Sequence, residues 1–373
     1  MATILDTDQV HLARAIELAE GGRGWASPNP LVGAVVVRDG VVLGEGYHHE
    51  VGRLHAEREA LAACGDADTA GATLYVSLEP CAHTGRTPPC TEAIVEAGIA
   101  RVVIASDDPS EHASGRGLGI LRDEGIEVVM ADGPLATQAR LLNQPFRKHA
   151  RTGRPHVLFK SAMSLDGKVA THTGDSKWIS GEASRARAHV WRAERDAVVV
   201  GIGTALADDP QLTARIEGAS RQPRRVVFDS EGRLPIDSQL VRGADEVPLT
   251  VVVSRAAPRT ATDALEVAGA EVIVATGENE PARVRSALDQ LGASGITSVL
   301  LEGGPHLAGS FLDAGEVDQL ALFIAPVLLG GSAARDPLEG EGVEHISEAV
   351  RALTLETESI GDDVLICARI REW

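Results

Sequence analysis

The sequence is poor in aromatic residues, in cysteine and in positive charge, and each shortage narrows the classes of protein it can belong to. Aromatic residues make up 3% of the 373 residues and hydrophobic residues 44%, so packed cores must consist mainly of Val, Leu, Ile and Ala. Four cysteines are too few for a disulfide framework in a chain of this length. A net charge of −19 argues against a broad basic face for DNA, RNA or an anionic membrane.

Two longer features are also missing. No hydrophobic run approaches the length of a transmembrane helix, and residues 1–20 contain acidic side chains where a signal peptide would need an apolar segment. We therefore expect a cytoplasmic protein without nucleic-acid or membrane partners. The G-x-G-x-x-G fingerprint of Rossmann folds is absent from every predicted strand-to-helix turn. The four lysines all lie between Lys148 and Lys177, which is either a patch for a phosphorylated ligand or chance in an arginine-favouring composition.

One group of residues has the chemistry of a metal site. His55-Ala56-Glu57 opens a predicted helix, and Pro80-Cys81 and Cys90 follow downstream. One imidazole and two thiolates suit a tetrahedral zinc whose fourth position is open for water. Glu57 is then placed to move protons for that water, which is the arrangement of the zinc deaminases with their H-x-E and P-C-x-x-C signature.

The match to that signature is incomplete, because eight residues separate Cys81 from Cys90 where the signature has two. A structural zinc is one alternative, and two buried thiols beside a surface histidine are another. Structural zinc sites usually have four protein ligands, and we find three, so the residues favour a catalytic zinc.

Hydrophobic periodicity predicts a first domain that is a three-layer α/β sandwich. A helix over 7–20 is followed by strands over 32–37 and 41–43, which Arg38-Asp39-Gly40 joins as a hairpin. The other predicted elements are a helix from His55 to about Cys64, a strand over 72–78, a helix from Cys90, a strand over 101–105, a helix over 117–125 and a strand at 128–129.

A polar segment over 143–155 contains two prolines and four cations. We place the domain boundary there, between a first domain of residues 1–148 and a second of residues 149–373. The second domain is also predicted to be α/β, with a helix that runs to about Arg195. Its strands are predicted over 156–161, 196–201, 225–229, 249–254, 271–275, 298–301 and 319–329, with 363–369 as an edge strand.

Two glycine-containing turns of the second domain are candidate phosphate sites. Gly201-Ile202-Gly203-Thr204 follows a predicted buried strand and continues as a loop to Asp208-Asp209-Pro210. Glu302-Gly303-Gly304 precedes a helix that begins near Pro305, where free backbone amides can bind phosphate. Each turn taken singly is more often an ordinary strand-to-helix connection, so a nucleotide site and that alternative both stay open.

Longer motifs resemble the bifunctional riboflavin-biosynthesis deaminase/reductase family over nearly the whole chain. In the first half they are Asn29-Pro30, Gly46-Tyr47-His48, His55-Ala56-Glu57 and the run from Glu79 to Cys90, whose long gap between cysteines that family shares. In the second half they are Lys160, Ser164-Leu165-Asp166-Gly167, Ser176-Lys177-Trp178-Ile179, Arg192-Ala193, Thr204, Asp208-Asp209-Pro210, Leu212-Thr213, Arg215 and Glu302-Gly303-Gly304-Pro305.

The resemblance implies two consecutive reactions, the first dependent on Zn²⁺ and the second on NADPH. Zinc hydroxide would attack the amine-bearing ring carbon of a diamino-hydroxy-phosphoribosylamino-pyrimidine, with Glu57 as the catalytic proton carrier, and ammonia would leave. A hydride from NADPH would then open and reduce the ribose of the product to ribityl. The resemblance also implies a cytidine-deaminase-like first domain and a dihydrofolate-reductase-like second domain, which accounts for the missing Rossmann fingerprint.

The resemblance further implies the residues that contact each ligand. The zinc ligands are His55, Cys81 and Cys90. Substrate is implied at Asn29, His48, His83, Thr87 and Asp108 in the first half and at Ser176, Arg192, Leu212, Arg215 and Glu302 in the second. The nicotinamide cofactor is implied at Ala162, Trp178, Thr204, Asp208, Ser230, Gly304, Pro305, His306, Leu307, Ala308, Gly309 and Ser310.

Side-chain chemistry adds to some of these assignments. Arg192 and Arg215 can each grip a phosphate in bidentate fashion. Trp178 can also be a core residue, the commoner fate of a lone tryptophan, but the adjoining Ser176-Lys177 favours a functional role. Arg255 is a candidate for the extra phosphate of NADPH.

The sequence departs from the family at a few positions. Ser110-Glu111 stands where the family usually has Asn-Pro, so the asparagine expected to touch substrate is Ser110 here. Arg58 replaces a usual valine and Ala82 a usual serine.

Three alternatives remain beside the bifunctional enzyme. They are a chain active in one half only, a zinc deaminase for another base, nucleoside or tRNA, and a non-catalytic protein with a decayed site. The acidic chain argues against tRNA. A decayed site is disfavoured by the intact set of His55, Glu57, Cys81, Cys90, Asp166 and Glu302. The expected partner is a small phosphorylated pyrimidine, and a homo-oligomer is left open.

Overall fold

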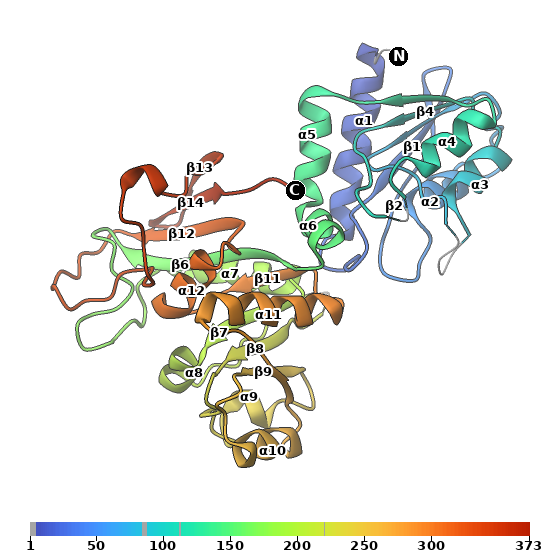
Figure 1. Ribbon diagram of the computed structural model, residues 1–373. Coiled ribbons are helices and arrows are strands. Elements are labelled where there is room, and N and C mark those ends of the chain that lie inside the picture. Colours follow the sequence, from blue (N-terminus) through green and yellow to red (C-terminus); the bar gives the residue numbers. More distant parts are fainter. Residues whose placement is uncertain (1–4, 84–87, 112, 220) are drawn as a thin grey trace. The chain divides into compact units, whose positions relative to one another are not determined.

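The computed structural model describes residues 5–83, 88–111, 113–219 and 221–373, and the chain divides into two compact units (Figure 1). The first unit runs to Thr152 and includes Trp373, and the second is Gly153–Glu372. The predicted boundary after residue 148 therefore falls inside a helix of the first unit, α6 (Gln144–Thr152). None of the helices in the described ranges has the length and apolar character that crossing a membrane requires.

The first unit is a five-stranded sheet between two layers of helices. Its strand order is β2-β1-β3-β4-β5, antiparallel around β1 and parallel from β3 onward. The strands are β1 (Gly33–Arg38), β2 (Val41–Tyr47), β3 (Thr73–Val76), β4 (Arg101–Ile104) and β5 (Glu127–Met130). The helices are α1 (Asp6–Ala19), the 3₁₀ turn η1 (Glu20–Gly22), α2 (Ala56–Ala63), α3 (Cys90–Glu96), α4 (Arg116–Asp123), α5 (Gly133–Leu142) and α6.

Alternate residues of β1 face the two helical layers, as the period of two in a strand requires. Ala34 and Val36 belong to the core that packs beneath α2, α3 and α4. Val35 and Val37 belong to the core that packs beneath α1 and α5. Figure 1 shows these two groups of helices on opposite sides of the sheet, which confirms the predicted three-layer sandwich.

The β1–β2 hairpin holds α2 in place. Its turn residues Asp39 and Gly40 have φ values of 49° and 78°, as a two-residue hairpin turn needs, and the predicted hairpin is confirmed. A Cβ on Gly44 would lie 2.2 Å from the carbonyl oxygen of Ala60, and one on Gly46 would lie 2.4 Å from the Ala60 nitrogen. The helix can approach the strand this closely only because both positions are glycine.

The second unit is a nine-stranded sheet with the order β10-β9-β8-β7-β11-β6-β12-β14-β13. Neighbours are parallel from β10 to β12, and β14 and β13 complete the sheet antiparallel. The strands are β6 (His156–Ser164), β7 (Ala197–Gly201), β8 (Arg224–Phe228), β9 (Leu249–Val253), β10 (Glu271–Val274), β11 (Ser298–Leu301), β12 (Gln319–Ala325), β13 (Thr354–Ile360) and β14 (Asp363–Arg369).

Helices cover both faces of this second sheet. They are α7 (Glu182–Glu194), α8 (Ile202–Asp208), α9 (Gln239–Arg242), α10 (Arg259–Val267), α11 (Glu280–Ala293), α12 (Pro305–Asp313) and the 3₁₀ turn η2 (Ile346–Glu348). Apolar residues of α11 and α12 pack on one face. Residues of α8, α9 and α10 pack on the other, together with Trp191 of α7.

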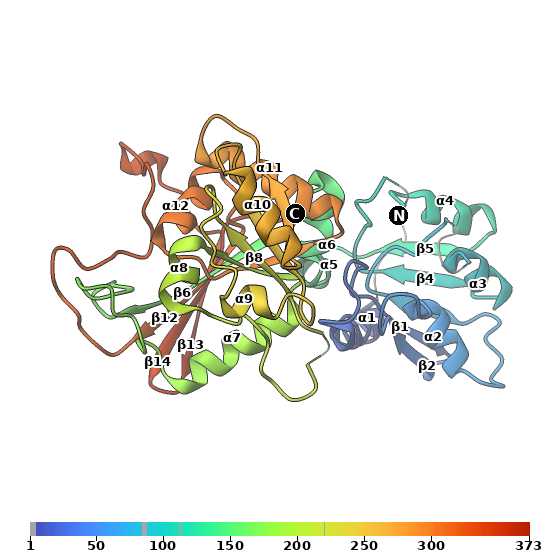
Figure 2. The same cartoon turned by 90° about the horizontal axis from the view of Figure 1, so that it is seen from below.

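The prediction that 363–369 is an edge strand is wrong. β14 pairs with β12 on one side and with β13 on the other, and Figure 2 shows the three strands side by side. The edge is β13, which the sequence did not reveal. Most of its side chains, including Glu356 and Glu358, are exposed, so it lacks the apolar alternation by which a strand is recognised.

Two segments for which no helix was predicted are helical. Most of the polar segment 143–155 forms α6, because tertiary partners accommodate its charges. Arg147 is 1% exposed and donates to the Asp107 carbonyl oxygen at 2.8 Å and to Ser106 Oγ at 3.1 Å. The segment after Gly201 forms the short helix α8, with Gly201 as its N-cap.

Asp8 provides a test of what stabilises the first unit. Its carboxylate is 1% exposed and accepts hydrogen bonds from Arg101 at 2.7 and 2.9 Å, from the Tyr75 hydroxyl at 2.9 Å and from the Leu5 N–H at 2.8 Å. Burial alone would raise the pKa of Asp8, but the bonds from Arg101, Leu5 and Tyr75 bring it below its usual range.

We predict that Asp8→Asn lowers the free energy of unfolding of the first unit by roughly 3 kcal/mol, because it leaves the Arg101 charge without its buried partner. A depressed carboxylate pKa stabilises the fold above the unfolded value of about 3.9 and loses that effect as pH falls through the folded value. The variant should therefore lose less stability than the parent on acidification. Calorimetry at several pH values measures both effects. Asp6→Asn at an exposed position of α1 is the control, and equal destabilisation by the two changes would contradict the prediction.

Candidate functional sites

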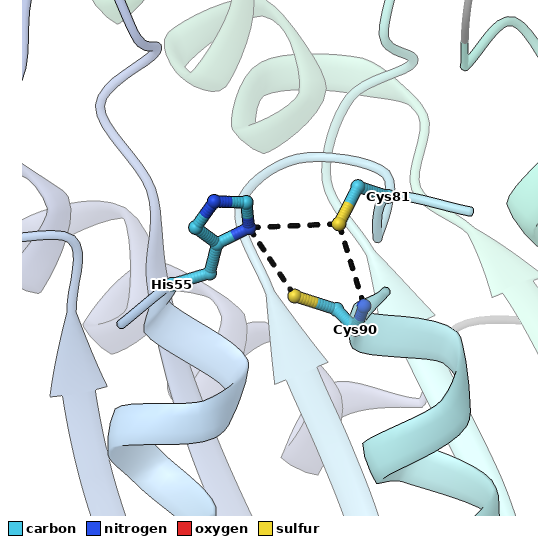
Figure 3. A group of neighbouring side chains, drawn as sticks. All are labelled: His55, Cys81 and Cys90. Atoms are coloured by element: carbon cyan, nitrogen blue, oxygen red, sulfur yellow. Dashed lines mark hydrogen bonds between the residues drawn. The ribbon is translucent and has the colours of Figure 1, made fainter. Parts of the chain in front are cut away.

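Three side chains of the first unit converge on one point (Figure 3). His55 is the N-cap residue of α2, Cys90 is the first residue of α3, and Cys81 lies in the segment that follows β3. His55 Nδ1 lies 3.5 Å from Cys81 Sγ and 3.4 Å from Cys90 Sγ. All three potential ligand atoms lie within 4.8 Å of one another, so one ion can bind all three.

The electrostatics of the trio favour a cation. The Cys90 side chain and the Cys90 backbone N–H, at 3.3 Å, donate to Cys81 Sγ, and with nearby His55 they lower the pKa of Cys81 to about 4. The shared proton and burial raise the pKa of Cys90. Hydrogen bonding to Cys81 likewise raises the pKa of His55. A dication that displaces the remaining protons fits a donor set of one imidazole and two sulfurs.

Glu57 follows in the first turn of α2 and is 3% exposed. Burial, assisted by the negative charge on Cys81, raises the pKa of Glu57 to about 7. A carboxyl group in that range can accept and return a proton near neutral pH.

An asparagine–histidine pair lies beside the metal ligands. His48 is 3% exposed, and its ring lies 5.4 Å from the His55 ring, centroid to centroid. Its Nδ1 is 3.0 Å from the carbonyl oxygen of Leu54, and its Nε2 is 3.0 Å from Asn29 Nδ2. Burial lowers the pKa of His48, so the neutral ring donates from Nδ1 and accepts the Asn29 amide at Nε2. The hydrogen bond to His48 therefore fixes the orientation of the Asn29 side-chain amide, including its oxygen.

The other predicted substrate residues of this half are distributed around the same segment. His83 is exposed, and Thr87 lies outside the described residues. Asp108 accepts the Ser110 N–H at 2.8 Å, and burial raises the pKa of Asp108. Sequence reasoning assigned no role to Glu79, which is 4% exposed and accepts the Gly115 N–H at 2.8 Å. This bond links the residues before Cys81 to the loop after Asp108. The position of Glu79, a single acidic residue directly before Pro80-Cys81, could have indicated such a role.

The second unit has a cleft of about 920 Å³ at the carboxyl ends of its parallel strands. Among the residues that line it are those of the two glycine-containing turns, Gly201 to Thr204 and Glu302 to Leu307. Gly304 is the N-cap of α12 and Pro305 its first residue, as predicted, so the amides at that end face the cleft without helical partners. A Cβ on Gly304 would lie 3.5 Å from Thr204 Oγ1, so the two turns are neighbours. Such a cleft fits a phosphate-bearing nucleotide.

Most of the predicted ligand residues of this half line the cleft. They are Ala162, Ser176, Trp178, Thr204, Asp208, Ser230, Glu302, Gly304, Pro305, His306, Leu307 and Ser310. Five do not line it: Arg192, Leu212, Arg215, Ala308 and Gly309. Gly309 instead packs where a Cβ would lie 1.7 Å from the Glu339 carbonyl oxygen. Arg255 does not line the cleft either, whereas Arg233 and Arg283 do.

A buried carboxylate at the cleft has two cationic neighbours. Arg192 donates to both oxygens of Glu302, at 2.6 and 3.0 Å, and Lys160 Nζ lies 3.7 Å away. Burial would raise the pKa of Glu302, but the charges of Arg192 and Lys160 lower it to about 2. Two donors of the Arg192 guanidinium are therefore directed at Glu302, and the assignment of Arg192 to a phosphate stays a prediction. Lys160 was absent from our predicted contacts, although a single lysine in an apolar strand was a signal.

Trp178 is 71% exposed, so the alternative that it is a core residue is wrong. The Arg185 guanidinium lies 4.8 Å from its ring centroid. The neighbouring Lys177 pairs with Asp208 at 2.8 Å, and Lys168 pairs with Asp336 at 2.6 Å. Lys148 belongs to the first unit. Lys168 and Lys177 thus each pair with a carboxylate and do not form a single phosphate patch.

We predict that Cys90→Ala abolishes stoichiometric zinc binding, since two protein ligands do not hold the ion against dilution. Metal analysis of purified protein should find about one zinc per chain in the parent and close to none in the variant. Cys64→Ala, which removes a buried thiol elsewhere in the same unit, is the matched control. Full zinc content in the Cys90 variant would contradict the assignment.

Comparison with known proteins accounts for both units. Residues 5–106 match the cytidine and deoxycytidylate deaminase zinc-binding region, and residues 155–366 match the RibD C-terminal domain. The chain is 44% identical over 360 residues to riboflavin biosynthesis protein RibD of Actinobacillus pleuropneumoniae, covering 96% of this chain and 94% of that protein. It is 39% identical over 375 residues to the RibD of Escherichia coli, covering 96% and 98%.

Solved structures agree over the full length. A RibD of Acinetobacter baumannii has a TM-score of 0.87 at 36% identity, covering 99% of this chain and 100% of that one. A protein of Thermotoga maritima described as a diaminohydroxyphosphoribosylaminopyrimidine deaminase/5-amino-6-(5-phosphoribosylamino)uracil reductase has a TM-score of 0.84 at 35% identity, covering 98% and 99%.

The first unit is therefore cytidine-deaminase-like and the second is a dihydrofolate-reductase-like RibD reductase domain, as expected. With its zinc-binding trio, its cleft and this similarity along nearly the whole sequence, the chain belongs to the RibD family of bifunctional riboflavin-biosynthesis deaminase/reductases.

Proposed function

We propose that this chain deaminates a phosphoribosylated diamino-hydroxypyrimidine and then reduces the ribose of the product with NADPH. The observation that carries the first step is the zinc-ligand trio with Glu57 buried beside it. The cleft over the amino end of α12 supports the second step, and the description of the Thermotoga maritima relative names both activities.

In the deamination, bound zinc would make hydroxide available near neutral pH. Glu57 takes the proton of the attacking water and returns it to the departing amine, which leaves as ammonia. A pKa of about 7 for Glu57 suits both transfers, and the charge of the metal would hold it somewhat lower. Asn29, fixed by His48, presents its amide oxygen to the pyrimidine, and Asp108 lies on a neighbouring loop.

In the reduction, a hydride adds to C1′ of the ribose, the C1′–O4′ bond breaks, and a proton ends on O4′. Nicotinamide supplies the hydride when bound. Lys160 and Glu302 meet at the cleft, and Lys160 can hold or donate a proton there. Glu302 remains ionised because Arg192 stabilises its charge, so it serves as a fixed acceptor for ligand hydroxyls.

We further propose NADPH over NADH, on the arrangement of cations in the cleft. Arg233 and Arg283 both line it, and Arg233 lies on the loop after β8, close in sequence to Ser230. A 2′-phosphate near that loop would find a guanidinium and a hydroxyl. Arg255, our original candidate, does not line the cleft.

The experiment that tests the proposed function follows ammonia and NADPH together on zinc-analysed protein. The phosphoribosylated diaminopyrimidine is supplied with and without NADPH. Ammonia in both reactions, with NADPH consumed only after ammonia appears, supports the two-step enzyme. Ammonia without NADPH loss supports a chain active in the deaminase half only. If no ammonia forms, the deaminated intermediate is supplied directly, and NADPH loss then identifies a chain active in the reductase half only.

We predict that Glu57→Gln keeps zinc and lowers ammonia release by at least about a hundredfold, the lower range of general acid–base effects. The amide has nearly the size of the carboxyl group but does not carry the proton. Reduction of the supplied deaminated intermediate, which takes place in the other unit, should be unchanged and serves as the internal control. Ammonia release at the parental rate would remove Glu57 from the mechanism.

We predict that the parent uses NADPH with higher kcat/KM than NADH, and that Arg233→Met narrows the difference about tenfold. The reason is that one guanidinium contact to phosphate contributes on the order of 1.5–3 kcal/mol. Steady-state kinetics with both cofactors on the deaminated intermediate measure the ratio. Arg255→Met is the matched control. An unchanged ratio in the Arg233 variant would place the phosphate elsewhere.

A further inference from the structure

A guanidinium links the two helices that carry the zinc ligands. Arg58 lies in the first turn of α2, directly after Glu57 and three residues after His55. Its NH2 donates to the carbonyl oxygen of Pro89 at 2.8 Å. Pro89 is the N-cap residue of α3 and immediately precedes Cys90. One hydrogen bond therefore joins the helix of the histidine ligand to the residue before a cysteine ligand.

Partial burial restricts the movement of the Arg58 side chain. Arg58 is half-buried, and among the described residues its Nε is buried without a hydrogen-bond partner. Burying a donor of a charged side chain without a hydrogen-bond partner lowers the stability of the fold, unless the same side chain contributes free energy through another interaction. The bond to Pro89 is such a contribution, since a charge-assisted hydrogen bond is stronger than a neutral one.

Arg58 contacts the residue before Cys90, and the position of Cys90 has to meet the geometric requirements of zinc. Zinc requires sulfur at about 2.3 Å and nitrogen at about 2.0 Å in tetrahedral geometry. Within the described part of the segment that contains Cys81 and Cys90, the Cys90 N–H donates to Cys81 Sγ, and the Thr91 N–H donates to the Cys81 carbonyl oxygen, both at 3.3 Å. Both sulfurs also contact His55 Nδ1, but a bound metal would take these ligand atoms for itself. The two backbone bonds hold the cysteines relative to each other. The Arg58–Pro89 bond adds a restraint between α2 and α3 that involves no ligand atom and therefore can persist when a metal is bound.

We propose that Arg58 is a positioning residue of the zinc site, which holds Cys90, and through it Cys81, at the distance from His55 that the metal requires. Outer residues that orient metal ligands commonly change metal affinity by 10- to 100-fold. The inference rests on the zinc site and not on the identity of the substrate. Zinc retention therefore tests it independently of the proposed function.

The test compares zinc release from the full chain loaded with one metal per site. Zinc-loaded parent, Arg58→Met, Arg58→Lys and Arg122→Met are mixed with an excess of a chromogenic chelator, and release is followed by absorbance. Arg58→Met keeps the apolar stem and should release zinc at least about tenfold faster than the parent. Arg58→Lys retains a charged donor group, so its rate of zinc release should lie between those of the parent and Arg58→Met. Arg122→Met removes an exposed charge from α4 and should behave as the parent.

A spectroscopic measurement separates positioning from general stability. With Co²⁺ in place of zinc, Arg58→Met should shift the visible ligand-field bands, because these report the geometry of the ligands, whereas a purely structural role would lower thermal stability and leave the bands unchanged. Parental release rate and parental bands in Arg58→Met would overturn the proposal. If that variant fails to fold, the Arg58→Lys comparison decides, and parental zinc release from it would count against the proposal.

Discussion

The zinc site depends on how closely α2 packs against β2. The Ala60 backbone lies where a Cβ on Gly44 or Gly46 would be, so any side chain there would push the helix outward. His55 and Glu57 lie at the start of that helix, and a shift of even an ångström would separate the imidazole from the cysteines of the neighbouring segment. The spacing of the metal ligands is therefore set by glycine in a strand that contributes no ligand itself.

In the second unit, the geometry of a parallel sheet brings the functional side chains together. Lys160 lies on β6 and Glu302 follows β11, two adjacent parallel strands, so both side chains reach the same edge. The cleft also collects residues after β7, β8 and β9, in keeping with the rule that open α/β sheets bind ligands outside the carboxyl ends of their strands. The buried Glu302 remains charged because Arg192, from a helix packed on the sheet, neutralises it at both oxygens.

Predictions from sequence succeeded where a residue's chemistry or a strong period decided the structure. The zinc trio and the β1–β2 hairpin are of this kind, because ligand type and an Asp-Gly turn are local signals. Predictions failed where residues distant in sequence determine the structure. The cations of α6 suggested a polar domain boundary, because the sequence does not show that Arg147 donates to Ser106 and Asp107. The strand β13 has almost no buried residues, so it lacks the pattern by which a strand is predicted. The carboxylate partner of Arg192 was missed for a related reason, since the sequence identifies a cation but not the distant carboxylate that pairs with it.

The loop that contains Ser110 bears on whether the deaminase half is impaired. Where the family has an asparagine, Ser110 donates its backbone N–H to Asp108, a bond that any residue except proline can make. Glu79 holds the same loop further along through Gly115. The anchoring of the loop thus comes from backbone donors and a buried acid, and the exchange to serine removes a side-chain amide without removing these restraints. For that reason we favour a working first half over a chain active only as a reductase.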